Sequence, residues 1–207
     1  MEQYFDPNSN IMKTLSEIGD LILVNILWIL TSLPVVTLGA STTAVYAVLK
    51  PRGKKDYDSS TVRRYFHAFR QNFRKSTLTF LIMLLPTAFA LVNCWLFLAG
   101  YLNESIFRYI ICALSVLLLL FGLNYLYPLI ASFDNTILRN IVNAFLIALA
   151  HLPTTLTLTL LNLFPLMIYL VVPTLFYRTI MIWIMIGFSL IVKVNCLLLE
   201  RVFQKYR

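Results

Sequence analysis

The sequence predicts an all-α protein, a polytopic transmembrane helical bundle with about five crossings, amphipathic interfacial helices and a kinked first span. Hydrophobic residues make up 59% of the 207 residues and charged residues only 13%, and the mean hydropathy is +0.79. Soluble domains carry about 25% charged residues, so this composition excludes an ordinary soluble domain. Several apolar runs reach the roughly 20 residues that a helix needs to cross a bilayer. We therefore expect a single membrane domain over residues 1–207.

The basic residues are concentrated beside apolar runs. More than half of the Lys and Arg residues lie between Lys50 and Lys75. Loops rich in Lys and Arg stay on the cytoplasmic side of a membrane, so we expect the 50–75 segment to be cytoplasmic. Lys193, Arg201 and Lys205 predict a cytoplasmic C-terminus by the same rule. Because the positive charge flanks apolar spans, it indicates membrane orientation and not nucleic-acid binding.

Residues 1–19 are predicted to form an interfacial lead-in helix. Ile11, Leu15 and Ile18 recur at helical spacing and give the segment one apolar face. The segment also carries Glu2 and Glu17 and lacks a signal-peptide cleavage pattern, so we expect the first span to be retained.

Residues 20–50 are predicted to form a broken first span. The apolar run is interrupted at Leu33-Pro34, where proline removes a backbone donor and disfavours helix at the residue before it. Thr37 is a suitable cap for a second helical segment. We favour one kinked crossing, with the N-terminus outside. The alternative is a re-entrant segment, which would place the N-terminus inside and leave the downstream topology unchanged.

The rest of the chain follows one plan, in which an amphipathic helix leads into paired spans. A basic amphipathic helix is expected after residue 60, then spans over about 76–100 and 106–130. Asp134 or Asn135 would cap a second amphipathic helix, and spans over about 154–171 and 175–199 follow. Residues 60–133 and 136–203 therefore suggest parallel two-span repeats. The alternative is that Leu-rich and Thr-rich spans resemble one another by composition alone.

Enzyme motifs are missing from the sequence, so we expect no enzymatic activity, no cofactor and no metal. Cys94, Cys112 and Cys196 are scattered without metal-ligand spacing and are expected to be packing residues. If an active site existed, its ionisable groups would have to come together from distant positions at the cytoplasmic surface. That cluster would consist of Asp134, His67 and His151.

Polar residues inside the spans are the main candidates for function, because they are costly in lipid. Asn25, Asn93, Asn124 and Asn162 each lie within a predicted span. Hydrogen bonds between packed helices are the alternative explanation for each of them.

In the broken first span, several of these signals coincide. A helix face with polar and aromatic residues precedes the break, and a stripe of small residues that allows close helix approach follows it. Either binding or helix packing would use these residues: Asn25, Trp28, Ser32, Pro34, Thr37, Gly39, Thr43 and Ala47.

The same stretch resembles a known family. Asp20-Leu, Asn25 and Trp28, followed by SLPVVTLGASTTAVYAVLK, are similar to the signature of the YesL-like bacterial membrane proteins, a family of unknown function. FHAFRQNFRKST (66–77) and Phe133-Asp134-Asn135 fit the same pattern. The resemblance implies a multi-pass protein of the bacterial cytoplasmic membrane, often encoded near genes of carbohydrate uptake. It implies no activity and no functional residues.

Two functional hypotheses follow. The first is an accessory or assembly partner of other membrane proteins, with a sugar-uptake permease or a second copy of the chain as its partner. This hypothesis expects an exposed groove at Gly39, Thr43 and Ala47. The alternative is a small transporter or solute-binding membrane protein with a polar cavity around Asn25, Ser32 and Thr37.

Overall fold

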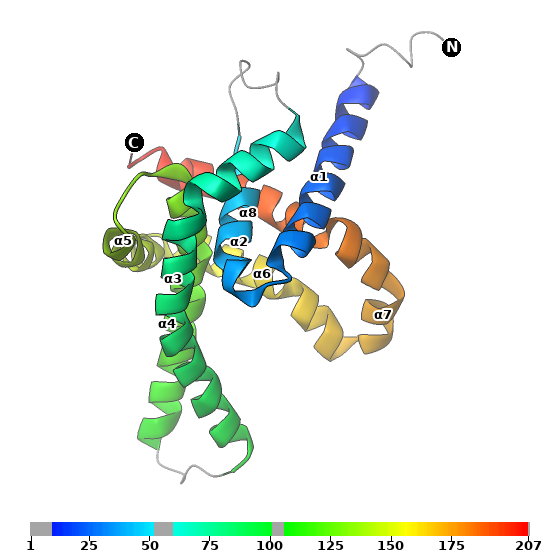
Figure 1. Cartoon of the computed structure of the whole chain (residues 1–207). Coiled ribbons are helices and arrows are strands. Elements are labelled where there is room, and N and C mark those ends of the chain that lie inside the picture. The colour runs from blue at the N-terminus through cyan, green and yellow to red at the C-terminus, as the bar shows by residue number, and fades with distance from the viewer. Residues whose placement is uncertain (1–9, 52–59, 101–105, 207) are drawn as a thin grey trace.

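The computed structural model describes residues 10–51, 60–100 and 106–206, and their regular secondary structure is entirely helical (Figure 1). The first half contains α1 (Asn10–Ser32), the 3-10 turn η2 (Val35–Thr37), α2 (Leu38–Leu49), α3 (Thr61–Leu98) and α4 (Ile106–Ser132). The second half contains α5 (Ile137–Ala150), α6 (Leu152–Val171), α7 (Pro173–Ile182), the π-helical segment η4 (Trp183–Gly187) and α8 (Phe188–Phe203).

Five helical stretches in the described part of the chain are long and apolar enough to cross a membrane. They are α1, α3, α4, α6 and the continuous run from α7 through η4 to α8. The predicted all-α helical bundle is therefore confirmed. α2 and α5 are shorter apolar helices. Whether the two halves are true repeats stays a prediction.

The expected single kinked crossing is wrong, because α1 and α2 fold back on each other as a hairpin. Trp28 on α1 donates to the hydroxyl of Thr42 on α2, so residues on either side of the break meet. Near the open end of the hairpin, Asp20 lines the same pocket as Leu49 and Lys50. The N-terminal end of α1 thus lies at the same end of the molecule as the start of α3 (Figure 1). The re-entrant alternative fits this geometry, because the start of α1 lies at the same end of the bundle as the start of α3.

The open end of the hairpin is fastened to two other helices. Asp20 accepts a hydrogen bond of 2.6 Å from Thr61 at the start of α3. Glu17 forms an ion pair of 3.2 Å with Lys193 on α8. These contacts join segments that are far apart in the sequence and hold the N-terminal part of α1 against the bundle.

The break itself is closed by Thr37, although in a different way from the predicted one. Its side chain makes no cap to α2. The hydroxyl instead lies 2.5 Å from the carbonyl oxygen of Thr31 and 2.7 Å from that of Pro34, and the Thr37 N–H donates to the Pro34 oxygen. The helix end of α1 exposes carbonyls that have no partner along the chain, and the Thr37 side chain supplies a donor to them.

α2 occupies the centre of the bundle and is covered by α3. Its small residues allow the two backbones to approach closely. A Cβ atom added at Gly39 would lie 2.6 Å from the carbonyl oxygen of Ser76 and 2.9 Å from the Cβ of Phe80. Thr43 and Ser76 then share a hydrogen bond of 2.9 Å between their hydroxyls.

The basic amphipathic helix runs directly into the following span and forms one continuous helix with it, α3, with Pro86 inside. The predicted cap of the second amphipathic helix differs from the observed one. At the start of α5, the N-cap position is Thr136, without a side-chain cap, and not Asp134 or Asn135. Asp134 is engaged by Lys75 instead, as described below.

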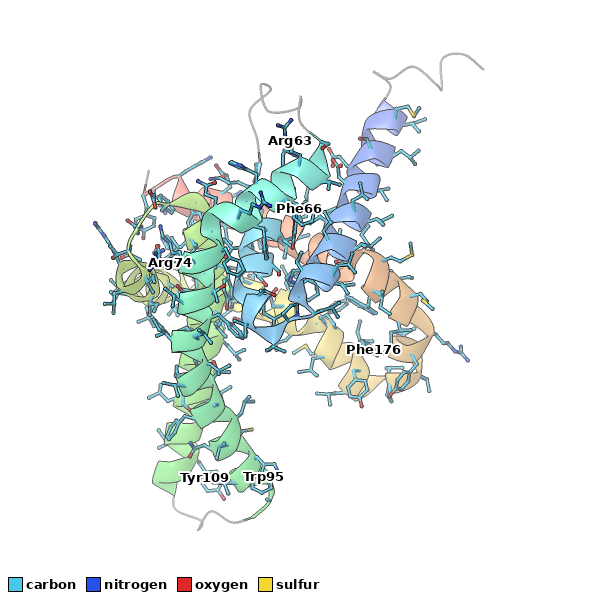
Figure 2. The ribbon with its side chains drawn as sticks, viewed as in Figure 1. Arg63, Phe66, Arg74, Trp95, Tyr109 and Phe176 are labelled. Atoms are coloured by element: carbon cyan, nitrogen blue, oxygen red, sulfur yellow. The ribbon has the colours of Figure 1, made fainter. Side chains whose placement is uncertain are left out.

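The two ends of the bundle differ in chemistry. Figure 2 shows Arg63 and Arg74 near the end that holds the start of α3, and Trp95 and Tyr109 at the opposite end of the α3–α4 hairpin. Basic residues at one boundary and aromatic residues at the other are typical of helices that cross a bilayer.

We predict that Gly39→Ala destabilises the protein by about 1–3 kcal/mol, because the added methyl group meets α3 backbone that cannot move away freely. Thermal or denaturant unfolding in detergent measures the change. Gly19→Ala is the matched control, since nothing lies within 4 Å of an added Cβ there. The control should be neutral or stabilising by up to about 1 kcal/mol. Equal effects of the two substitutions would contradict the close α2–α3 approach.

Candidate functional site

Asn25 joins α1 to the irregular segment before α8. Its Nδ2 donates to the carbonyl oxygen of Ile184 at 2.6 Å, and its Oδ1 accepts from the Ser189 N–H at 2.9 Å. Residues 184 and 189 are five apart, which is the spacing that a π-helical turn pairs. The Asn25 side chain therefore bridges two backbone groups where the regular α-helical hydrogen-bond pattern is interrupted. Asn25 is 1% exposed. The Asn25 amide therefore forms its hydrogen bonds with backbone groups of the same protein.

Trp28 lies on the same face of α1 as Asn25 and contacts α8 as well as α2. Its ring stacks on Phe188 with centroids 3.9 Å apart and an interplanar angle of 19°. Ser32, one turn further, has a buried hydroxyl without a hydrogen-bond partner in the described structure. The face of α1 that was selected from the sequence therefore packs against α8. The alternative expectation placed a polar solute cavity at this face.

The stripe of small residues is an internal contact. Gly39 and Thr43 are buried and Ala47 packs against the hydrophobic core, while Pro34 in the break is exposed. The expectation that Gly39, Thr43 and Ala47 form an exposed groove is therefore wrong. The physical reason is that α3 of the same chain fills the space that the missing side chains leave.

A chain of asparagine amides runs through the middle of the bundle. Asn195 on α8 donates to Asn162 on α6 at 2.9 Å, and Asn162 donates to Asn124 on α4 at 2.7 Å. Asn124 then donates to Thr159 at 2.7 Å. Asn195 also donates to the hydroxyl of Tyr46 on α2 at 3.3 Å. The four helices are thereby joined by polar contacts inside an apolar core.

Asn162 is the asparagine of this network that reaches the surface of the protein. Asn195 is 0% exposed and Asn124 is 8% exposed, whereas Asn162 is exposed. It lies ten residues into α6, about 15 Å along the helix axis, which is half the thickness of a hydrocarbon core. In a bilayer crossed by α6, an exposed amide at this position would have no water to bond with.

Sequence reasoning missed Asn195 and Tyr46 as members of the network. Asn195 lies in an apolar span, and the rule that identified the other asparagines applies to it equally. Tyr46 gave no such signal. Asn93, which the same rule did identify, donates to the Phe89 carbonyl oxygen of its own helix.

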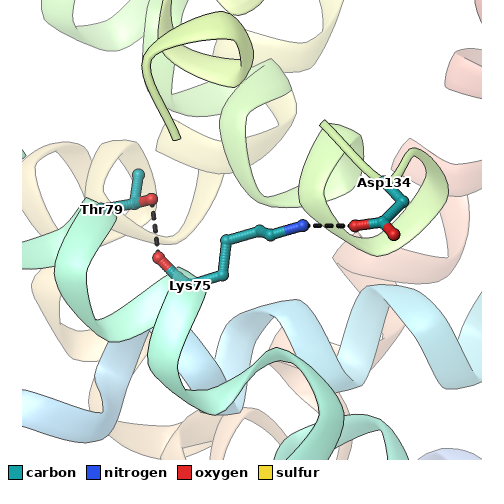
Figure 3. Close-up of polar contacts among 3 residues, drawn as sticks. All are labelled: Lys75, Thr79 and Asp134. Carbon is teal, nitrogen blue, oxygen red and sulfur yellow. Dashed lines mark hydrogen bonds and ion pairs between the residues drawn. The ribbon is translucent and has the colours of Figure 1, made fainter. Parts of the chain in front are cut away.

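Of the three residues of the predicted cytoplasmic cluster, Asp134 and His151 enter separate contacts and His67 is exposed. Asp134 forms an ion pair of 2.6 Å with Lys75, whose backbone carbonyl oxygen accepts from Thr79 (Figure 3). His151 Nε2 lies 3.1 Å from the Tyr206 hydroxyl, and His67 is exposed on α3. No group of three His, Cys, Asp or Glu side chains suited to a metal occurs within the residues that the structure describes.

The Lys75–Asp134 pair links α3 to the turn between α4 and α5. The hydrogen bond from Lys75 and its positive charge hold the pKa of the Asp134 carboxyl below its usual range. The Asp134 side chain is fully exposed and that of Lys75 is 28% exposed. Solvent screens such a pair, so it positions the turn more than it stabilises the fold.

We predict that Asn25→Leu lowers the free energy of unfolding by about 1–3 kcal/mol for each backbone group left without a partner, at Ile184 and Ser189. Unfolding in detergent measures the loss. Asn93→Leu makes the same change in a span without removing a contact between helices, and should be close to neutral. An Asn25→Leu variant as stable as wild type would show that the backbone ladder closes again by itself.

We also predict that Asp134→Asn destabilises the protein at neutral pH but not in acid. A carboxyl whose pKa is lowered by folding stabilises above its unfolded pKa, and this contribution disappears as the pH falls through the folded value. Melting temperatures of both proteins across the acidic range test this. In a Lys75→Met background, the Asp134→Asn effect should vanish at every pH. A difference that persists in acid would assign another role to Asp134.

Comparison with known proteins gives one family match. Residues 21–94 match the family described as "Protein of unknown function, DUF624", and the matched region covers the hairpin of α1 and α2 and most of α3. No curated protein and no solved structure matches the chain. Over roughly a third of its length, the chain is therefore similar to an uncharacterised family, and its helices are those of a multi-pass membrane protein.

Proposed function

We propose that the protein is an accessory or assembly partner of another multi-spanning membrane protein, and that α6 supplies the contact. The observation that carries the proposal is the exposed amide of Asn162 at mid-span. A polar side chain facing lipid is unfavourable, whereas a partner helix can hydrogen-bond to it, with a gain of about 0.6 kcal/mol or more.

The surface around Asn162 suits a helix. Leu166 and Tyr169 follow at spacings of four and seven residues, so they lie on the same face of α6, and both are exposed at 51% and 41%. Two of the four hydrogen-bonding positions of the Asn162 amide contact Asn124 and Asn195. The side chain is therefore held in place before a partner arrives, which reduces the entropy cost of binding.

The contacts at Asn25 support this proposal over a solute-binding function. The alternative, a small transporter, needs polar groups at the broken first helix that face a cavity. There the Asn25 amide and the Thr37 hydroxyl bond to backbone of this chain. The proposal includes no catalytic role for the chain. The resemblance to YesL-like proteins suggests a bacterial sugar-uptake permease as the first partner to test.

A photo-cross-linking residue at Leu166, incorporated in native membranes, tests the proposal. We expect a covalent adduct with a multi-spanning permease, identified by mass spectrometry. Asn162→Leu should reduce the adduct several-fold, because it removes the exposed amide. Asn195→Leu breaks one of the two internal bonds that Asn162→Leu removes, without changing the exposed surface, and should keep most of the adduct.

A cross-linking residue at Leu138 is the positional control, because it is 74% exposed on α5, away from this face. Equal protein adducts at Leu138 and Leu166 would contradict a specific α6 surface. An adduct of two copies of this chain would replace the accessory function by self-association.

A further inference from the structure

A second surface lies on α5, well separated in sequence from the Asn162 face. A cavity of about 510 Å³ is lined by α5, by the end of α4 and by the C-terminal segment. Its size is within the range of small-molecule sites, roughly 300–1,000 Å³. Of the contacts described above, the one between His151 and the Tyr206 hydroxyl reaches its lining.

The lining changes from polar to apolar along α5. Arg139 and Asn143 are four residues apart, so they lie on one side of α5, and Asn135 lines the cavity from the turn just before the helix. Leu146, Ile147 and Ala150 continue the lining further along the same helix. The groove therefore offers a polar, basic half followed by an apolar half.

The charge of the groove favours an anion. Arg139 is the one charged side chain among the described residues that line it. The nearest carboxylate in the sequence, Asp134, is already paired with Lys75 at 2.6 Å. A guanidinium with amide groups beside it is a common arrangement for binding phosphate.

The position of α5 in the bundle places the groove beside lipid headgroups. α5 connects the end of α4 to the start of α6, and Figure 1 shows it nearly end-on beside the upper part of α3 and α4. It therefore runs across the bundle, at the end where the basic residues are found. One row of its side chains is apolar and exposed: Leu138, Val142, Leu146 and Leu149. Helices with this pattern lie in the interface of a membrane.

From these observations we propose that the groove binds an anionic phospholipid. The phosphate is held by Arg139 with the amides of Asn135 and Asn143. An acyl chain lies along Leu146, Ile147 and Ala150. Basic pockets beside membrane helices recognise headgroups in this way. The proposal is independent of the Asn162 surface, because a lipid bound on α5 requires no protein partner.

Native mass spectrometry of the delipidated full-length protein in detergent tests the proposal, with phosphatidylglycerol or phosphatidylcholine added in increasing amounts. We expect phosphatidylglycerol to bind about tenfold more tightly, and Arg139→Gln to remove that preference. Arg139 is exposed, so the variant should fold normally, and its melting temperature checks this.

Three comparisons make the outcome decisive. Arg70→Gln removes an exposed arginine from α3 at the same end of the bundle, and should leave the preference unchanged. Leu146→Gln changes a residue that is 59% exposed in the apolar half, and should weaken the binding of both lipids several-fold. Inorganic phosphate at millimolar concentration should not displace the lipid.

Any of three results would overturn the proposal. Equal losses in Arg139→Gln and Arg70→Gln would mean that diffuse positive charge attracts the lipid. Displacement by inorganic phosphate would identify a simple anion site. Unchanged lipid binding in Leu146→Gln would show that the acyl chain lies outside the groove.

Discussion

The structure depends on one constraint, which is that backbone groups inside a membrane must find their partners within the protein. The helical ladder is irregular at the break after α1 and at the π-helical segment before α8. Thr37 supplies a hydroxyl to the carbonyl oxygens of Thr31 and Pro34 at the first of these. Asn25 supplies an amide to the second. Because each irregularity is closed by a side chain of the first fifty residues, the hairpin of α1 and α2 organises the remaining helices.

Close packing follows from the same hairpin. α2 is short and rich in small residues, so it can lie at the centre and approach α3 at Gly39. Tyr46 then carries the polar network from α2 to Asn195 and onward to α6 and α4. Because α2 fills the centre, the helices around it have outer faces that remain exposed. Those faces, on α5 and α6, are the ones that the proposed lipid and protein contacts use.

Much of the fold could be predicted from local patterns, because composition and helical periodicity are properties of neighbouring residues. The functional candidates were harder, because their role depends on which residues lie opposite them. Asn25 and Gly39 were correctly selected as unusual, but their partners at Ile184 and Ser76 are distant in the sequence. Asn195 was overlooked, although the same rule applied to it. Asp134 was expected to cap the following helix or, in an enzyme, to lie near His67 and His151, and its actual partner is Lys75.

The sequence by itself determined that the chain is helical and membrane-embedded, where the first span breaks, and at which end the positive charge gathers. Length, hydropathy and proline chemistry act locally and suffice for these conclusions. Only the tertiary structure decided that the break reverses the chain, since Pro34 permits both a kink and a hairpin. It also decided that the stripe of small residues faces α3, and that Asn162 is the network amide left exposed. A hydrogen bond or a close helix contact requires two surfaces, and the sequence displays only one of them at a time.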